Sequence, residues 1–163
     1  VKEANATFVA LQEVDRYLKR SKAVDQVKII SEIGNLPYTH FHKTVSHPQA
    51  PNCTEEAEFG IAVLSKFPIQ EVIVKNYEYM IPGNEQRVAI AARVDLSSEL
   101  QQEDGTTELW FINTHIGLNF TFGEQGRQAK ELILFLQEHK ITEHPNVIIC
   151  GDFNSFAAVC SSI

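Results

Sequence analysis

The sequence lacks several features that define large classes of proteins. No apolar run approaches the roughly 20 residues that cross a bilayer, and no heptad array, solenoid period or low-complexity tract is present. The cysteines Cys53, Cys150 and Cys160 are odd in number and have no paired spacing, so they support neither a disulfide framework nor a zinc knuckle. Basic residues are also scarce, with 14 against 21 acidic ones and a formal net charge of −7. That balance excludes a protein that grips nucleic acid by bulk positive charge, but not an enzyme that contacts a few phosphates.

The composition is otherwise that of a globular domain. Hydrophobic residues make up 44% of the 163 residues and charged residues 21%, which excludes wholesale disorder. A chain of this size buries enough surface for one substantial core. Because no internal linker separates its segments, we expect a single domain. The sequence decides neither the cellular compartment nor the oligomeric state.

The hydrophobic pattern predicts a chain that consists mostly of strands. Short apolar runs predict strands over residues 7–14, 38–43, 59–65, 69–79, 87–96, 108–114 and 146–150, with the first and last buried. Residues 45–58 have the composition of a loop. Helical spacing predicts a helix up to Gly34, which is expected to be its C-cap, and a second over 125–140 with a buried face of Ala129, Leu132, Ile133 and Leu136. Consecutive strands argue against a doubly wound parallel sheet and favour two sheets, or one large mixed sheet, with helices outside.

Chemically competent side chains follow three of these strands. Glu13 lies at the end of the first, His115 follows the sixth, and Asp152 and Asn154 follow the last. Carboxylates at the ends of buried strands have a rigid support and suit a hard cation such as Mg²⁺, which takes one or two protein oxygens and completes its shell with water. Each acid alone is more often a polar turn residue. The combination of acids, a histidine and an asparagine at three strand ends is much less expected by chance.

The blocks that carry these residues resemble the endonuclease/exonuclease/phosphatase superfamily, most closely its deoxyribonuclease I-like, Mg²⁺-dependent endonuclease-like branch. The blocks occur in the family's order and cover nearly the whole chain: LQEVDR at 11–16, VDQ at 24–26, FGIAVLSKFPI at 59–69, EQRVAIAA at 85–92, NTHIGLN at 113–119, GRQAKELILFL at 126–136 and NVIICGDFNS at 146–155. The resemblance implies an α/β fold, a four-layer α/β/β/α sandwich of two mixed sheets flanked by helices.

The resemblance also implies a role for each residue that matches the family's motifs. Glu13 corresponds to the glutamate that binds the metal, Mg²⁺ or Mn²⁺. Asp152 corresponds to the aspartate that orients or deprotonates the attacking water. Asn154 corresponds to the asparagine that hydrogen-bonds the scissile phosphate, and His115 to the histidine that stabilises its negative charge. The implied activity is hydrolysis of a phosphate ester by in-line attack of water.

Other polar residues leave alternatives open. Arg87, in a block where relatives carry an arginine near the cleft, is either a phosphate contact or part of a structural ion pair. Asn119 lies near the predicted rim of the site and is a candidate substrate contact. His40, His42 and His47 form an H-x-H-x₄-H pattern, which fits a zinc site but more often belongs to strand-surface or loop residues.

Two parts of the family pattern have no counterpart in the sequence. The family's first strand carries an asparagine that supports the metal site, and its last block, Ser-Asp-His, supplies a second catalytic histidine. None of the six histidines here follows Asp152. We therefore expect residues 1–163 to be a partial domain, incomplete at both ends, that is inactive by itself.

The leading functional prediction is a phosphodiesterase or endonuclease that acts on nucleic acid or another phosphodiester. One alternative is a phosphatase or phosphodiesterase acting on lipid or inositol head groups. The other is a non-catalytic binding domain.

Overall fold

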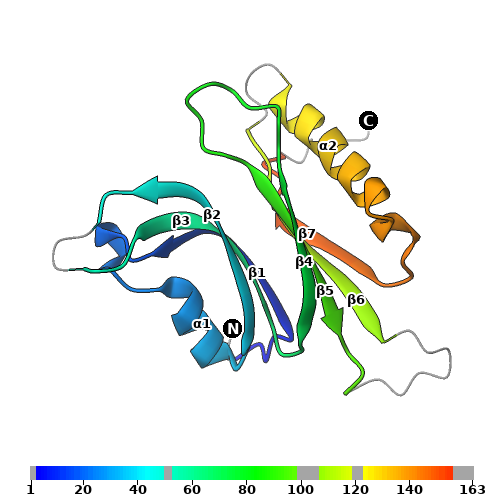
Figure 1. The fold of residues 1–163 in the computed structure, drawn as a ribbon, viewed down its shortest axis with the longest axis horizontal. Coiled ribbons are helices and arrows are strands. Elements are labelled where there is room, and N and C mark those ends of the chain that lie inside the picture. The colour runs from blue at the N-terminus through cyan, green and yellow to red at the C-terminus, as the bar shows by residue number, and fades with distance from the viewer. Residues whose placement is uncertain (1–2, 50–52, 99–106, 119–122, 156–163) are drawn as a thin grey trace, which may run out of the picture.

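The first of two β-sheets contains the N-terminal strands. The computed structural model describes residues 3–49, 53–98, 107–118 and 123–155 (Figure 1). Strand β3 (Ala57–Ser65) lies between β1 (Phe8–Arg16) and β2 (Tyr38–His47) and is antiparallel to both. A 3₁₀ turn, η1 (Lys19–Ser21), and helix α1 (Gln26–Gly34) connect β1 to β2. The carboxylate of Asp25 accepts a hydrogen bond from the backbone N–H of Lys28 and so caps α1 at its start.

The second sheet has four strands in the order β4-β5-β6-β7. The strands β4 (Ile69–Asn76), β5 (Val88–Asp95) and β6 (Glu108–His115) form an antiparallel meander. Helix α2 (Glu124–Glu138) and a 3₁₀ turn, η2 (Ile141–Glu143), then return the chain, so that β7 (Val147–Asp152) pairs parallel to β6. Within the described residues no helix is long and apolar enough to span a membrane.

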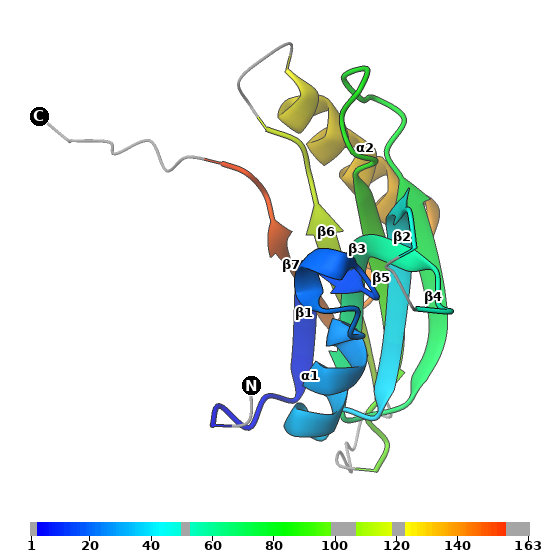
Figure 2. The ribbon, with the colours of Figure 1, turned by 90° about the vertical axis from the view of Figure 1, so that its left-hand side faces the viewer.

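Three buried clusters separate four layers, which run from the lower left to the upper right in Figure 1 as α1, β1–β3, β4–β7 and α2. Val27 and Leu36 pack under α1 against the first sheet. Ile61 and Val63 of β3 meet Val88 and Ile90 of β5 between the sheets, and residues of α2 cover the outer face of the second sheet. Figure 2, with α1 toward the viewer, shows the first sheet in front of the second. The predicted four-layer sandwich is confirmed; the second sheet is mixed, whereas the described strands of the first are all antiparallel.

Several local predictions were wrong in ways that packing explains. The predicted loop 45–58 begins as strand, because β2 continues to His47 and β3 starts at Ala57. The C-cap of α1 is Asn35, which adopts the left-handed conformation at φ 52°, a position that asparagine tolerates. Ile133 is 55% exposed. On the buried face of α2, Gln128 and Glu124 take part instead, and both bind polar groups there.

Strand β7 is less buried than its apolar sequence predicted. Ile148 and Ile149 are 44% and 45% exposed. The reason is that β7 is the outermost strand of the described sheet and has a hydrogen-bonded neighbour, β6, on one side only.

Acidification is expected to destabilise this fold through two histidines. Burial, helped by neighbouring His42, lowers the pKa of His40 below its ordinary value of 6.5, and the Nε2 atom of His40 is buried without a hydrogen-bond partner. The pKa of His115 is lowered as well. As pH falls below about 6.5, the unfolded chain binds protons at these positions before the folded chain does, so stability decreases until the folded-state pKa is passed.

We expect the melting temperature to fall between about pH 7.5 and pH 5, and the fall to be smaller in His40→Gln. Thermal unfolding followed by circular dichroism measures both. A melting temperature that stays constant over this interval would contradict the assignment.

Candidate active site

Strand register gathers several of the predicted site residues at one edge of the sandwich. His115, the last residue of β6, pairs with Asp152 of β7 on one side and with Val88 of β5 on the other. Arg87 immediately precedes Val88 and therefore also lies beside His115. Because β6 and β7 are parallel, their last residues meet at the same end of the sheet, which is why two predicted strand-end residues 37 positions apart become neighbours.

A buried asparagine holds the middle of β1 over the second sheet. Asn113, on β6, is fully buried, and its Nδ2 donates to the backbone oxygens of Leu11 and Ala62, both at 2.9 Å. Its Oδ1 accepts a hydrogen bond of 2.6 Å from Nε2 of Gln12. One side chain of the second sheet thus binds two strands of the first. Since Glu13 follows Gln12 directly, this bridge fixes where the side chain of Glu13 projects from β1.

Glu13 lies in a β-bulge. The pairing of β1 with β3 shifts between Leu11 and Val14, and Glu13 between them has a positive φ of 55°. A left-handed backbone is uncommon for a residue with a side chain, and such strain concentrates at functional sites. A bulge also redirects a side chain relative to the pleat. The Glu13 carboxylate is exposed and accepts no hydrogen bond from the residues that the structure describes, so it remains free to bind a ligand.

His115 is buried at 3% exposure beside a cation and near three carboxylates. Nη1 of Arg87 lies 2.8 Å from Nδ1 and 2.9 Å from Nε2 of the ring. Burial lowers the pKa of His115, and Arg87 lowers it further, whereas Asp152, Glu85 and Glu13 act in the opposite direction. A neutral imidazole has one acceptor nitrogen and one N–H. Both ring nitrogens lie within reach of the Arg87 guanidinium, and the tautomer sets which of them accepts from it and which carries the N–H.

Asp152 presents one anchored and one open carboxylate oxygen. Its Oδ1 accepts a 2.8 Å hydrogen bond from the backbone N–H of Asn154, while Oδ2 lies 3.9 Å from Nε2 of His115. The side chain is half exposed. Asn154 is held in turn, because its Nδ2 donates to the backbone oxygen of Ile116 at 2.7 Å. Gly151 has to be glycine, since a Cβ there would lie 1.9 Å from the backbone oxygen of Thr114.

The donor set at this edge fits a hard divalent cation better than a zinc ion. No group of three or more His, Cys, Asp or Glu that could hold a metal gathers within the described ranges, whereas structural zinc sites need four such ligands. Mg²⁺ keeps several waters and needs one or two carboxylates. The free carboxylate of Glu13 meets that requirement.

The structure also decides the fate of the other candidates. Arg87 contacts both Glu85 and His115. It therefore forms an ion pair and also lies beside a candidate site residue. Asn119 lies outside the described residues. His40 and His47 line different pockets, beside α1 and beside Glu13 respectively. Among the described residues the H-x-H-x₄-H pattern therefore forms no zinc site, in line with the reading of these histidines as strand-surface or loop residues.

Sequence reasoning missed Glu85 and Asn113. Glu85 stands two residues before Arg87, which is the spacing that gives two residues of an extended chain the same direction, so this signal was available. Its Oε1 accepts a hydrogen bond of 2.8 Å from Thr44. The role of Asn113 gives no local signal, because its partners lie 51 to 102 residues away.

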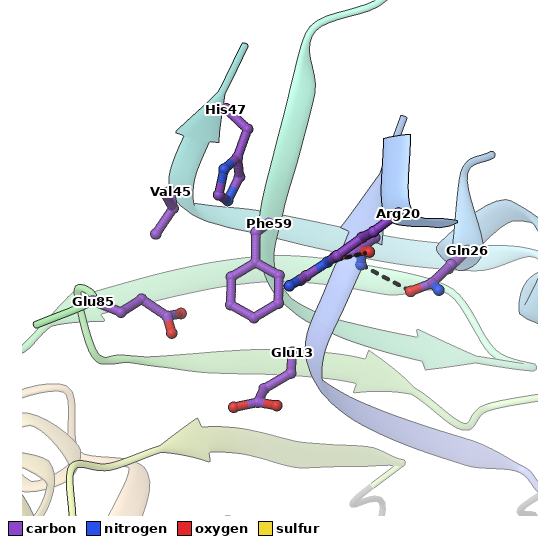
Figure 3. A pocket seen from close by; sticks show the side chains of 8 residues that line it. Glu13, Arg20, Gln26, Val45, His47, Phe59 and Glu85 are labelled. Carbon is purple, nitrogen blue, oxygen red and sulfur yellow. Dashed lines mark hydrogen bonds and ion pairs between the residues drawn. The ribbon is translucent and has the colours of Figure 1, made fainter. Parts of the chain in front are cut away.

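A pocket of about 560 Å³ opens beside this edge (Figure 3). Glu13 and Glu85 line this pocket and are also close enough to His115 for their charges to act on it. In Figure 3 their carboxylates lie on the side nearest the second sheet. The remaining lining comes from the first sheet and the segment after β1: Asp15, Arg20, Gln26, Val45, His47 and Phe59.

Comparisons with known proteins agree with this architecture. The sequence model of the Endonuclease/Exonuclease/phosphatase family matches residues 1–158. Among curated proteins, none matches the chain.

Similar solved structures include the human Nocturnin catalytic domain with bound sulfate anion (17% identity, TM-score 0.65, 95% of this chain and 54% of that one). Sphingomyelinase C from Streptomyces griseocarneus is 19% identical, with a TM-score of 0.63 over 94% of this chain and 53% of that one. An endonuclease/exonuclease/phosphatase from Beutenbergia cavernae DSM 12333 is 19% identical, with a TM-score of 0.62 over 94% and 40%. At these identities the likeness concerns the fold. The chain spans about half the length of these structures.

Proposed function

Because the chain belongs to the Endonuclease/Exonuclease/phosphatase family, we propose that it carries catalytic residues of a metal-dependent phosphodiesterase, with nucleic acid as its first substrate class. The observation that supports this most is the surroundings of His115. A neutral, buried imidazole lies between a guanidinium and a carboxylate, at the edge where the free carboxylate of Glu13 emerges. Hydrolysis of a phosphodiester needs donors for the phosphate oxygens, a base for water and a cation site, all within one small region.

The donors come from His115 and Asn154. In its neutral form His115 carries one N–H that can donate. Asn154 uses one N–H of its amide on Ile116 and retains the other. Both are held by hydrogen bonds before substrate arrives, and preorganised donors stabilise developing negative charge without reorganising. These two side chains would bind the non-bridging oxygens of the scissile phosphate.

Asp152 would act on the attacking water. Its Oδ1 is fixed by the backbone N–H of Asn154, whereas its Oδ2 is half exposed. A carboxylate oxygen oriented in this way accepts a hydrogen bond from water and takes its proton as the water attacks phosphorus. Nε2 of His115 lies 3.9 Å from this Oδ2, so the ring borders the position that the water would occupy.

Glu13 would hold Mg²⁺ or Mn²⁺. When bound, such an ion neutralises a phosphate oxygen and stabilises the leaving oxygen. The bulge that redirects Glu13 and the absence of a competing hydrogen bond among the described residues both leave its oxygens available.

The test is the metal dependence of Glu13→Gln in the longest natural chain that contains residues 1–163. We expect the Mg²⁺ concentration that gives half-maximal rate to rise by at least about 10-fold, since the loss of groups that merely support metal ligands already costs about 10–100-fold in affinity. The assay uses DNA, RNA, sphingomyelin and inositol phosphates in parallel, so that the substrate class is measured together with the metal effect.

Glu138→Gln is the matched control, because Glu138 lies at the exposed end of α2, away from this edge. It should leave the Mg²⁺ requirement unchanged. Hydrolysis that persists after chelation of divalent cations, or an unaltered Mg²⁺ requirement in Glu13→Gln, would refute the proposal.

A further inference from the structure

The pocket beside Glu13 contains a cation that faces outward over a buried anion. Arg20 donates to both oxygens of Asp15, from Nη2 to Oδ1 at 2.6 Å and from Nε to Oδ2 at 2.9 Å. The Asp15 side chain is 7% exposed and that of Arg20 is 62% exposed. The pair is neutral in sum, but a ligand in the pocket meets the guanidinium first. Nη1 of Arg20 has no partner among the described residues and can donate two hydrogen bonds.

The ring of Phe59 contacts both this guanidinium and the imidazole of His47, so that all three side chains line one wall of the pocket. The guanidinium carbon of Arg20 lies 5.1 Å from the centre of the Phe59 ring, and the His47 ring meets Phe59 edge-on at 6.5 Å and 86°. Figure 3 shows Arg20 and His47 on the two sides of Phe59. His47 is exposed, and its imidazole makes no hydrogen bond within the part of the chain that the structure describes. The amide of Gln26 accepts from the backbone of Asp15 and retains its own N–H groups as donors.

The other carboxylates of the pocket are already neutralised, with one exception. Asp15 is paired with Arg20, and Glu85 binds Thr44 at 2.8 Å and Arg87 at 3.4 Å. Among the lining acids, only Glu13 has neither a hydrogen bond nor a close ion pair within the described residues, although its charge acts on nearby Arg20. The pocket is therefore polarised: one border carries the carboxylate that would hold the cation, and the opposite wall carries unpaired donors on Arg20, Gln26 and His47.

We propose that this wall binds a second phosphate group of the substrate, covalently linked to the phosphodiester that is cut beside Glu13. This inference rests on the proposed function and adds a subsite to it. A volume of about 560 Å³ accommodates a nucleotide-sized unit. Arginine is well suited to phosphate because its planar donors are fixed relative to one another. The subsite makes the enzyme prefer substrates with neighbouring phosphates over isolated phosphodiesters.

The experiment compares the binding of dithymidine monophosphate, which has a single phosphate, with its 5′-phosphorylated and 3′-phosphorylated forms. Calorimetric titration in Mg²⁺ uses the longest natural chain with Asp152→Asn, so that ligands are not consumed. We expect one phosphorylated form to bind about 10-fold more tightly than the parent, as befits charge-assisted hydrogen bonds at a partly exposed site. His47→Gln and Arg20→Gln should each remove most of that advantage without weakening the parent ligand.

Two further variants keep the result interpretable. Arg20→Gln leaves Asp15 buried and unpaired, so a double variant with Asp15→Asn removes both charges together and should show the same loss of selectivity. His42→Gln, on the same strand as His47 but outside the pocket, should retain the full advantage. Equal affinity for all three ligands, or variants that weaken parent and phosphorylated ligands alike, would overturn the subsite. Failure of the proposed function itself appears separately, as an unchanged Mg²⁺ requirement in Glu13→Gln.

Discussion

Asp152→Asn is expected to lower kcat/KM for a phosphodiester by about 10²–10⁴-fold, the range typical for loss of a general base. The amide retains an oxygen that can accept from the backbone of Asn154, so the local geometry survives. It cannot take a proton from water at neutral pH. The effect should therefore appear in kcat with little change in KM, since an interaction made only in the transition state is lost.

The matched control for this substitution is Asp95→Asn. Asp95 lies at the far end of β5, at the opposite edge of the same sheet, and its carboxylate caps the backbone N–H of Ser97. It should retain the wild-type rate. Steady-state kinetics on the longest natural chain, together with circular dichroism spectra of both variants, separates catalysis from folding. A loss of less than about 10-fold in Asp152→Asn would assign the base to another group.

Asn113→Leu is expected to destabilise the fold by about 2–5 kcal/mol, because it leaves the backbone oxygens of Leu11 and Ala62 without their buried amide donor. Gln12 loses its partner as well. For a chain of this size such a change corresponds to a decrease in melting temperature on the order of 5–15 °C. Below the new melting temperature, the segment of β1 around Gln12 should also be held less firmly against the second sheet. We therefore expect the Mg²⁺ concentration that gives half-maximal rate to rise as well.

Asn146→Leu provides the comparison. Asn146 also donates from Nδ2 to a backbone oxygen, that of Glu108, but this hydrogen bond stays within the second sheet. It should cost about 1 kcal/mol, the net value of an ordinary hydrogen bond. Denaturant unfolding monitored by tryptophan fluorescence measures both variants, since Trp110 is buried. Equal stability of the two variants would mean that Asn113 does not tie the sheets together.

Local sequence patterns predicted the order of helices and strands because buried side chains recur with a different period in a helix than in a strand. The order of strands and helices and the four-layer sandwich were confirmed. The pattern erred where burial depends on a neighbour elsewhere in the chain, as at β7, whose isoleucines are partly exposed for want of a second adjoining strand. It erred again at α2, where Gln128 is buried because it binds Gly117 and Tyr79.

The chemistry of the candidate site was partly visible in the same way. Acids, a histidine and an asparagine at strand ends identified Glu13, His115, Asp152 and Asn154 as candidates, and their catalytic roles remain predictions. The sequence gives their residue types directly, and its hydrophobic pattern predicts the strand to which each of them is attached.

Only the tertiary structure decided how these residues face one another. The left-handed bulge at Glu13 and the contact of Arg87 with His115 arise from strand register within each sheet. The outward-facing Arg20 over Phe59 arises from the packing of the η1 turn on the first sheet. The hydrogen bond between Gln12 and Asn113 joins positions 101 residues apart. Short-range periodicity reports which side of a strand is buried, but it contains no information on which distant strand will lie beneath it, and that pairing sets the geometry on which the proposed chemistry depends.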